Sequence, residues 1–541
     1  MSNVSMTYAE NEPTPAAVAA DPPSPIGSLR KGRGLDNERI DGIALAVAAG
    51  IALTSLAFYG YCLFPGLGGE LNAGDSAKFQ ILGHTSILVH GPGYPLILLL
   101  GIVLRALHLP FEPWWTMTIA MAAMPASFAN AMAFLIVRRI TGSVPFAIGG
   151  ALLLGTAGLM AVQATEAEVY PLALAFILTI TYLLIRFVDT ERVPFFIAAC
   201  GVYAISFGNH LMMIMLVGLF TAVAVTYRRK LLRLQVVAVV ASFVLLGASQ
   251  YLFLAYVSYH PATAWSEYMP LPPEPIEFVH YVMGTYFGDL YGSGLDSTRN
   301  AEALLATLRS AHPYVSMPLI LVGLALFVAG LRRYDRDWVA LAIIFGVGLS
   351  FLPFMLWYGA YDIQAFHLPL LGPLLVAATA TVGWWLKGRR RAMICAATLL
   401  VVFGMARAVQ ASAILADREP LFTGLIPTVE QVVSQAPVEN PIISMTYGLR
   451  MATLYYELLG QLPEARYELS WRVLAAIGDE NPVGGVIMPT DGEQMIRWIE
   501  HSRPDLECST LRIEAPQGTA WPAYGFFCKR SAEQTRIAPP L

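Results

Sequence analysis

Three short polar segments interrupt a chain of 541 residues in which 56% of the residues are apolar and 13% are charged. Residues 165–171 (TEAEVYP) place Glu166 and Glu168 two positions apart, and residues 208–211 (GNHL) place an asparagine beside a histidine. Carboxylates between apolar segments are costly unless they are hydrated, form ion pairs or serve a function. Carboxylate, imidazole and amide groups on one face would suit proton transfer and the binding of hydroxyl or phosphate groups.

The longest of the three segments, residues 74–95 (GDSAKFQILGHTSILVHGPGYP), carries Asp75, His84 and His90. It ends in a stretch with two prolines and two glycines. Proline fixes φ and glycine permits unusual φ values, so we expect this stretch to hold a defined shape against the membrane. The alternative for this segment is an ordinary turn. For residues 165–171 the alternative is a solvated loop, and for residues 208–211 it is an interfacial histidine.

The composition indicates which class of protein carries these segments. A soluble domain has about 25% charged residues, and half that share cannot cover a soluble globule of this size. The mean hydropathy of +0.57 also excludes a soluble enzyme. The net charge of −4 provides no basic face for nucleic acid. We therefore expect a polytopic membrane protein.

Apolar runs of the length that a membrane helix requires, roughly 17–25 residues, predict eleven spans. They lie near residues 43–64, 115–137, 144–163, 171–188, 193–208, 211–227, 234–257, 315–331, 338–357, 365–386 and 393–410. A twelfth apolar stretch, 94–108, is short and contains Arg105 and His108.

Charge decides how the twelfth stretch is interpreted. If 94–108 stays out of the membrane, the loops on the amino-terminal side hold 19 Lys and Arg residues and the opposite loops hold four. The positive-inside rule then predicts a cytoplasmic amino terminus and an interfacial or re-entrant 94–108. In a bacterium this would be the inner (plasma) membrane. All three polar segments fall on the extracytoplasmic face. The acids of the long loop 258–314 fit an ordinary solvated loop.

We predict three regions: a disordered cytoplasmic tail (1–42), a multi-span membrane domain (43–410) and an extracytoplasmic α/β domain (411–541). Strands are expected at 442–445, 484–488, 509–513 and 524–528, and helices near 449–460 and 491–502.

A disulfide between Cys508 and Cys528 is expected in the carboxy-terminal domain. A hairpin centred on Gly518 places the two residues directly opposite each other, at a Cα separation that a disulfide accepts. The other three cysteines lie in or at spans. The alternative is that both residues are small buried hydrophobic groups.

The polar segments also resemble a known family. The sequence contains, in order, GDS (74–76), HGPGYPL (90–96), EVY (168–170), GNH (208–210) and DIQAFHLP (362–369). These motifs resemble the signature G-D-S…H-P-P-G-Y-P-L…E-V-Y…G-N-H of a branch of the GT-C glycosyltransferases that is related to protein O-mannosyltransferases. Gly91 departs from it, because the family usually has proline there.

The resemblance implies a GT-C-like membrane domain with an interfacial helix in its first outer loop. It implies a glycosyltransferase that takes a sugar from a polyprenyl-phosphate donor in the membrane lipid. The sugar passes to a hydroxyl of a protein, glycan or lipid on the extracytoplasmic face, with inversion. The catalytic residues would be Asp75, as general base, and Glu168. The residues that bind sugar, phosphate or acceptor would be His90, Tyr94, Glu166, Asn209, His210 and Asp362.

Two other functions stay open from the residues alone: a transporter or flippase of a lipid-linked or amphipathic substrate, and a scaffold that displays the carboxy-terminal domain. We expect no cofactor. Asp75, His84 and His90 offer ligands for a divalent cation, but no second acid stands one residue away, so no metal site is expected.

The charge distribution gives a testable topology. The amino terminus and the loops 228–233 and 387–391 should be cytoplasmic, and residues 411–541 should lie outside, because basic loops stay inside. A reporter that is active only in the cytoplasm, fused after residue 420, should be silent. Activity of that fusion would reverse the topology.

Overall fold

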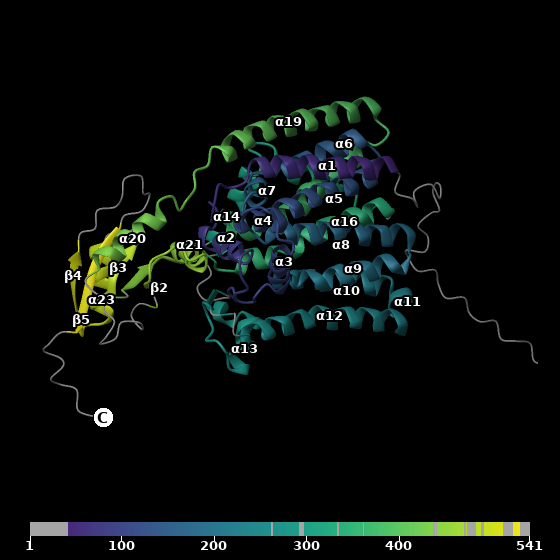
Figure 1. Cartoon of the computed structure of the whole chain (residues 1–541). Coiled ribbons are helices and arrows are strands. Elements are labelled where there is room, and N and C mark those ends of the chain that lie inside the picture. Colours follow the sequence, from purple (N-terminus) through teal and green to yellow (C-terminus); the bar gives the residue numbers. More distant parts are fainter. Residues whose placement is uncertain are drawn as a thin grey trace, which may run out of the picture.

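The computed structural model describes residues 42–530, except 261–262, 264, 291–296, 333–334, 361, 437–438, 440, 470–471, 473–482, 488–491 and 512–522. A bundle of roughly parallel and antiparallel helices forms one part, and an α/β domain lies beyond one end of it (Figure 1). The predicted tail falls almost entirely outside the described residues.

The bundle follows the predicted apolar runs. Its helices are α1 (Gly42–Tyr61), α4 (Pro113–Thr118), η2 (Ile119–Ala123), α5 (Met124–Thr141), α6 (Val144–Gly155), α7 (Gly158–Gln163), α8 (Tyr170–Thr190), α9 (Val193–Ser206), η3 (Leu211–Leu216), α10 (Val217–Thr226), α11 (Arg228–Leu231), α12 (Leu234–Tyr259), α15 (Ser316–Ala329), α16 (Arg336–Ser350), α17 (Leu352–Trp357), η5 (Ile363–His367), α18 (Leu368–Trp385) and α19 (Arg390–Ala416).

Helices occupy all eleven predicted spans. Within the described residues, seven helical stretches are long and apolar enough to cross a membrane. The other four predicted spans coincide with shorter apolar helices: α6, α9, η3 with α10, and α15. The protein is therefore an integral, multi-pass membrane protein.

Burial separates central helices from peripheral ones. In α18, 94% of the apolar window is buried, against 11% in α12 and in α19. Small residues allow the close packing of α18, because a Cβ on Gly323 of α15 would lie 2.5 Å from the Cα of Ala378. The exposed apolar faces of α12 and α19 are those that membrane lipid would cover.

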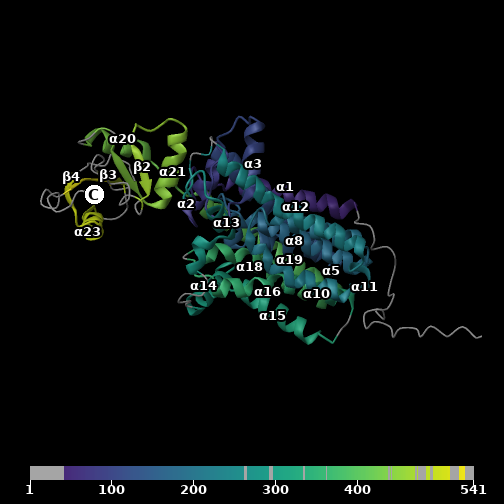
Figure 2. The same ribbon diagram turned by 90° about the horizontal axis from the view of Figure 1, so that it is seen from below.

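The two ends of the bundle differ. The basic helix α11 lies at the end far from the α/β domain (Figure 1). The near end carries α2 (Ala73–Ile81), α3 (Pro95–Ala106), α13 (Pro275–Met283), η4 (Thr285–Leu290) and α14 (Ser297–Ser310). Figure 2 shows α3 at this end, across the direction of the long helices. This arrangement agrees with an interfacial position for 94–108.

The carboxy-terminal domain is a mixed five-stranded sheet with helices. Its elements are α20 (Leu425–Gln435), β1 (Ile442–Met445), α21 (Tyr447–Leu458), β2 (Arg466–Leu469), β3 (Val483–Ile487), α23 (Gly492–Ser502), β4 (Leu506–Leu511) and β5 (Ala523–Arg530). The strand order is β2-β1-β3-β5-β4, and β1 runs parallel to both β2 and β3. Helix α21 follows β1 directly and packs on α2 of the membrane domain.

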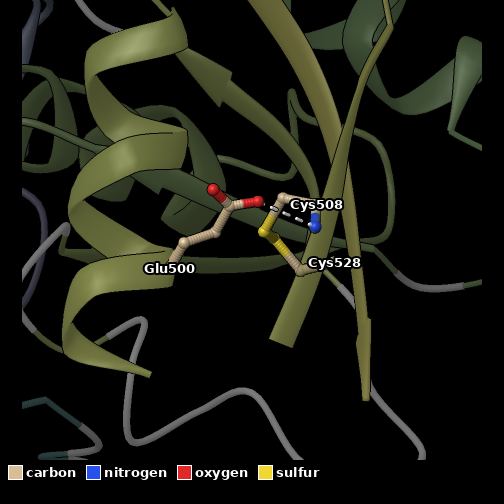
Figure 3. Close-up of a disulfide and its surroundings, with 3 residues drawn as sticks. All are labelled: Glu500, Cys508 and Cys528. Atoms are coloured by element: carbon tan, nitrogen blue, oxygen red, sulfur yellow. Dashed lines mark hydrogen bonds between the residues drawn. A yellow bond between two sulfur atoms is a disulfide. The ribbon is translucent and has the colours of Figure 1, made fainter. Parts of the chain in front are cut away.

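The predicted disulfide is confirmed. Strands β4 and β5 are antiparallel, Cys508 pairs with Cys528, and their Cα atoms are 4.1 Å apart. The bond lies beside α23, where Glu500 accepts a hydrogen bond from the Cys508 amide (Figure 3). The predicted turn residue Gly518 lies outside the described residues.

Alkylation of the denatured, non-reduced protein should leave Cys508 and Cys528 unmodified, whereas Cys62, Cys200 and Cys395 react. Replacing the pair by alanine should lower the free energy of unfolding of the domain by about 3 kcal/mol, because a loop of this length is no longer closed in the unfolded chain. Two alkylated residues at 508 and 528 in the non-reduced protein would contradict the pairing.

Candidate active site

A cavity of about 680 Å³ lies where α2, the 90–94 turn, η3, the segment 267–287 and the start of α21 meet. It is at the end of the bundle next to the carboxy-terminal domain. Five of the predicted site residues line it: Asp75, His90, Tyr94, His210 and Asp362. These residues come from four separate parts of the chain, so the fold gathers the polar segments that the sequence distributes along it.

Helix α2 positions the aspartate. Asn72 caps its amino terminus by accepting a hydrogen bond from the Asp75 amide at 3.1 Å. An acid in the first helical turn is favoured by the helix dipole. Lys78 follows one turn later, and its ammonium nitrogen lies 2.6 Å from Asp75 Oδ1.

Lys78 is the centre of the polar network. Its side chain is 0% exposed, and the ammonium group donates to Asp75 Oδ1, His90 Nδ1 and the Tyr447 hydroxyl. The Tyr447 hydroxyl in turn donates to Asp75 Oδ1 at 3.1 Å. Burial raises the pKa of Asp75, but the charge of Lys78 and the hydrogen bonds from Lys78 and Tyr447 outweigh it, so the pKa falls to about 2.

Lys78 also fixes the state of His90. An ammonium group only donates, so Nδ1 accepts and the ring proton resides on Nε2, which lies 3.1 Å from the Tyr94 hydroxyl. Burial, with the positive charge of Lys78, lowers the pKa of His90 to about 3. The imidazole is therefore neutral, and the Tyr94 hydroxyl keeps its own proton for a ligand.

The 90–94 turn explains the departure from the family motif. A Cβ on Gly91 would lie 2.5 Å from the carbonyl oxygen of Tyr281, so a side chain does not fit there. The Tyr281 hydroxyl donates to the Val89 carbonyl at 2.6 Å and ties α13 to this turn. Tyr94 has φ of 49°, a left-handed conformation that turns the chain into α3.

Glu166 does not line the cavity. Its Oε1 lies 2.8 Å from Arg418 Nη1, both side chains are almost fully buried, and its Oε2 accepts from the Leu71 amide at 3.2 Å. Arg418 also donates to the Cys62 carbonyl and to Thr165 Oγ1. Removing one member of a buried ion pair costs roughly 3–5 kcal/mol. Glu166 therefore holds the end of α19 against the outer loops, and nothing places it against a substrate.

Glu168 and Asn209 lie behind the cavity wall. Glu168 Oε1 is 3.5 Å from Ser76 Oγ, and burial, together with the nearby charge of Asp75, raises its pKa well above the ordinary value. Asn209 is fully buried and donates to the Val169 carbonyl at 3.1 Å. Neither side chain lines the cavity.

His210 and Asp362 lie on the cavity wall with defined partners. His210 Nδ1 accepts from the Met212 amide at 3.0 Å, which leaves Nε2 with its proton. Burial lowers the pKa of His210 to about 4. Asp362 Oδ2 accepts from the Asn72 side chain at 2.9 Å, so the acid contacts the cap of the helix that carries Asp75.

Sequence reasoning missed three residues of this site: Lys78, Glu267 and Tyr447. Lys78 stands three positions after Asp75, the spacing of a helical pair, and that signal was available. Glu267 belongs to the long loop that we expected to be merely solvated. Tyr447 reaches Asp75 across 372 positions of sequence, and no local pattern signals such a contact.

The cation ligands considered from the sequence do not come together. His84 lies apart from Asp75, with Nε2 3.3 Å from the Leu458 carbonyl oxygen. Among the described residues, no group of three or more histidine, cysteine, aspartate or glutamate side chains is arranged to hold a metal ion.

Comparison with known proteins identifies the fold. Residues 75–234 match the family model of the protein O-mannosyl-transferase TMEM260 N-terminal domain. The structure resembles ArnT from Cupriavidus metallidurans bound to undecaprenyl phosphate, with a TM-score of 0.53 and 10% identity over 92% of this chain and 99% of that one. The chain is a membrane protein of the GT-C glycosyltransferase fold.

Other GT-C structures give weaker similarity. The arabinofuranosyltransferase AftD from Mycobacteria has a TM-score of 0.49 and 14% identity, covering 91% of this chain and 40% of that one. The oligosaccharyltransferase AglB from Archaeoglobus fulgidus has 0.42 and 12%, covering 92% and 75%. No curated protein matches the sequence. The prediction of a GT-C-like membrane domain is confirmed by the fold, and the family match agrees with the prediction of a glycosyltransferase.

The Lys78 network predicts a pH effect. Replacing Lys78 by Met removes the main charge that lowers the pKa of Asp75, so this pKa should rise. Glycosyl transfer by K78M should then fall, as pH decreases, at a higher pH than transfer by the wild type, because the carboxylate is protonated earlier. The measurement is a pH–rate profile of each purified protein, beside a check of folding.

The half-exposed Lys230 of α11, which pairs with Glu191 at the other end of the bundle, provides the control. K230M should keep the wild-type profile. An equal loss of rate at every pH in K78M would assign to Lys78 a role other than holding Asp75 ionised.

Proposed function

We propose that this GT-C protein transfers a sugar from a polyprenyl-phosphate donor to an acceptor hydroxyl on the extracytoplasmic face, with inversion and with Asp75 as general base. The observation that carries the proposal is the state of the Asp75 carboxylate. Its Oδ1 is held by Lys78 and Tyr447, whereas among the described residues no hydrogen bond reaches Oδ2. The side chain is 23% exposed and lines the cavity.

One wall of the cavity suits a lipid chain. Leu211, Met212, Ile214 and Met215 line it from η3, and Met283 lines it from α13. Ile214 and Met283 are also exposed, at 47% and 67%, on the outer surface of a membrane bundle. A polyprenyl chain can therefore pass from the bilayer to the cavity along side chains without polar groups. ArnT, a solved structure of the same fold, was determined bound to undecaprenyl phosphate.

Neutral hydrogen-bond donors on the cavity wall suit the phosphate of the sugar donor. His210 and Tyr94 lie next to the apolar wall, and each has a proton to offer on Nε2 and on the hydroxyl, as described above. Lys78 supplies positive charge from behind Asp75. A phosphate is already a competent leaving group, so donors aimed at its developing charge are more useful than a general acid.

In the proposed step, Asp75 Oδ2 takes the proton of the acceptor hydroxyl while the oxygen of that hydroxyl forms a bond to the anomeric carbon. The bond from that carbon to the phosphate oxygen breaks on the opposite face, and its electron pair leaves with the polyprenyl phosphate. A carboxylate with a low pKa is a weak base, and it suffices because the proton moves late, when the hydroxyl has become acidic.

A donor panel tests the function. The purified protein in detergent is incubated with polyprenyl-phosphate donors of mannose, glucose and arabinose, without and with peptide, glycan or lipid acceptors. Release of polyprenyl phosphate from at least one donor is expected, and the new linkage should have the opposite anomeric configuration to that donor. Binding or movement of the lipid without release would favour a flippase.

Asp75→Asn should lower sugar transfer by about 10²–10⁴-fold, the usual contribution of a general base. Asparagine keeps the size and hydrogen bonding of the side chain but cannot take the proton, so donor binding should change little. Transfer at saturating donor and donor affinity are measured on the same folded preparation.

The exposed Asp417, at the end of α19, offers a matched control. D417N should behave as the wild type. Near-normal transfer by well-folded D75N would exclude Asp75 as the base.

A further inference from the structure

Glu267 has no place in the step described above, yet it lines the same cavity. It is 3% exposed, and within the described residues neither of its carboxylate oxygens has a hydrogen bond of normal geometry. The hydroxyls of Tyr268 and Tyr447 are its polar neighbours. A buried carboxylate without adequate donors is costly. Its persistence beside a cavity indicates a ligand that supplies hydroxyl groups.

The position of Glu267 is fixed by its neighbours on the chain. The Leu88 amide donates to the Trp265 carbonyl at 3.3 Å, and Leu88 forms a parallel bridge with Ser266. From the carboxy-terminal domain, Arg472 donates to the Ser266 carbonyl at 3.3 Å. The backbone around Glu267 is thus held from the first outer loop and from the α/β domain.

A continuous series of aromatic rings leads from the apolar wall to Glu267. His210 contacts Tyr94 (5.7 Å between ring centroids), Tyr94 contacts His90 (5.2 Å), and His90 contacts Phe287 (5.6 Å). Phe287 then contacts Tyr268, the residue after Glu267, at 5.4 Å. The series begins beside the residues proposed to contact lipid and phosphate and ends beside the Glu267 carboxylate.

The parts of the proposed sugar donor follow each other in the same order along the molecule: the lipid chain, the phosphate and the sugar. If the lipid lies against η3 and the phosphate against His210 and Tyr94, the sugar ring lies along His90 and Phe287, beside Asp75. The end of the sugar that is remote from the anomeric carbon then reaches Glu267.

We propose that Glu267 accepts hydrogen bonds from hydroxyl groups on the remote side of the donor sugar and thereby selects which sugar is transferred. This assignment rests on the proposed function and adds to it a residue that determines specificity. Aromatic rings present flat apolar surfaces to the C–H face of a sugar, and a carboxylate can take two neighbouring hydroxyls. A site built to bind a hydroxyl rejects an analogue that lacks it, because its buried polar group then stays unpaired.

The experiment uses the donor that the wild-type protein turns over, with water as the acceptor, together with analogues of that donor that each lack one sugar hydroxyl. Release of polyprenyl phosphate gives kcat/KM for each. E267Q and E267A should lower kcat/KM for the parent donor by about 10- to 100-fold, the effect expected for a hydrogen bond to a charged group.

The decisive readout is coupling between the residue and one hydroxyl. For the analogue that lacks the hydroxyl bound by Glu267, the wild type should already be slow, and E267Q should cause little further loss. The exposed Glu302 on α14 is the control, and E302Q should retain the wild-type selectivity. Glutamine removes an uncompensated buried charge, so E267Q should fold at least as well as the wild type.

Other results overturn the proposal. An equal loss for the parent donor and every analogue would mean that Glu267 acts on the fold or on Asp75. Unchanged release to water, with reduced transfer to an added acceptor, would assign Glu267 to the acceptor instead. If the wild type releases polyprenyl phosphate from no donor in the panel, the proposed function fails, and this assignment fails with it.

Discussion

The ammonium group of Lys78 is the constraint on which the rest of the site depends. It is removed from water completely, and all three of its N–H groups are used by Asp75, His90 and Tyr447. These partners come from α2, the turn before α3 and the first residue of α21. A buried cation requires such partners, so one charge joins the first outer loop to the carboxy-terminal domain. It also keeps Asp75 ionised and sets the tautomer of His90.

The bundle supports this arrangement by leaving its polar groups at one end. Helix α18 is almost fully buried, and glycines at its contacts, such as Gly323 of α15 against Ala378, let neighbouring helices approach it closely. The buried pair of Glu166 and Arg418 fixes the end of α19, and with it the start of the chain that leads to α20 and β1. Rigid helices thus carry a site built almost entirely from the connections between them.

The sequence predicted the parts that depend on local pattern. Apolar length marked the spans, charge bias separated the two ends, and hairpin symmetry paired Cys508 with Cys528. It was less informative about which polar residues face the cavity. Asn209 belongs to the same motif as His210, and Glu166 lies in another of the three polar segments, yet both are turned into the packed wall, where they contact the Val169 carbonyl and Arg418. A motif indicates which residues are important, but it does not show whether a residue contacts a ligand or supports the wall of the cavity. Tyr447 and Glu267 were missed because only tertiary packing brings them to Asp75.

Tyr447 is also the second residue after β1, at the carboxyl edge of the parallel strands, where open α/β sheets place their binding residues. This position has a consequence for the order in which the protein is made. The bundle is complete when α19 ends at Ala416, but Lys78 still lacks one of its three partners until residue 447 has been synthesised and α21 has docked. A nascent chain therefore carries an incomplete site while its membrane part assembles. Completion of the site is tied to the folding of the carboxy-terminal α/β domain.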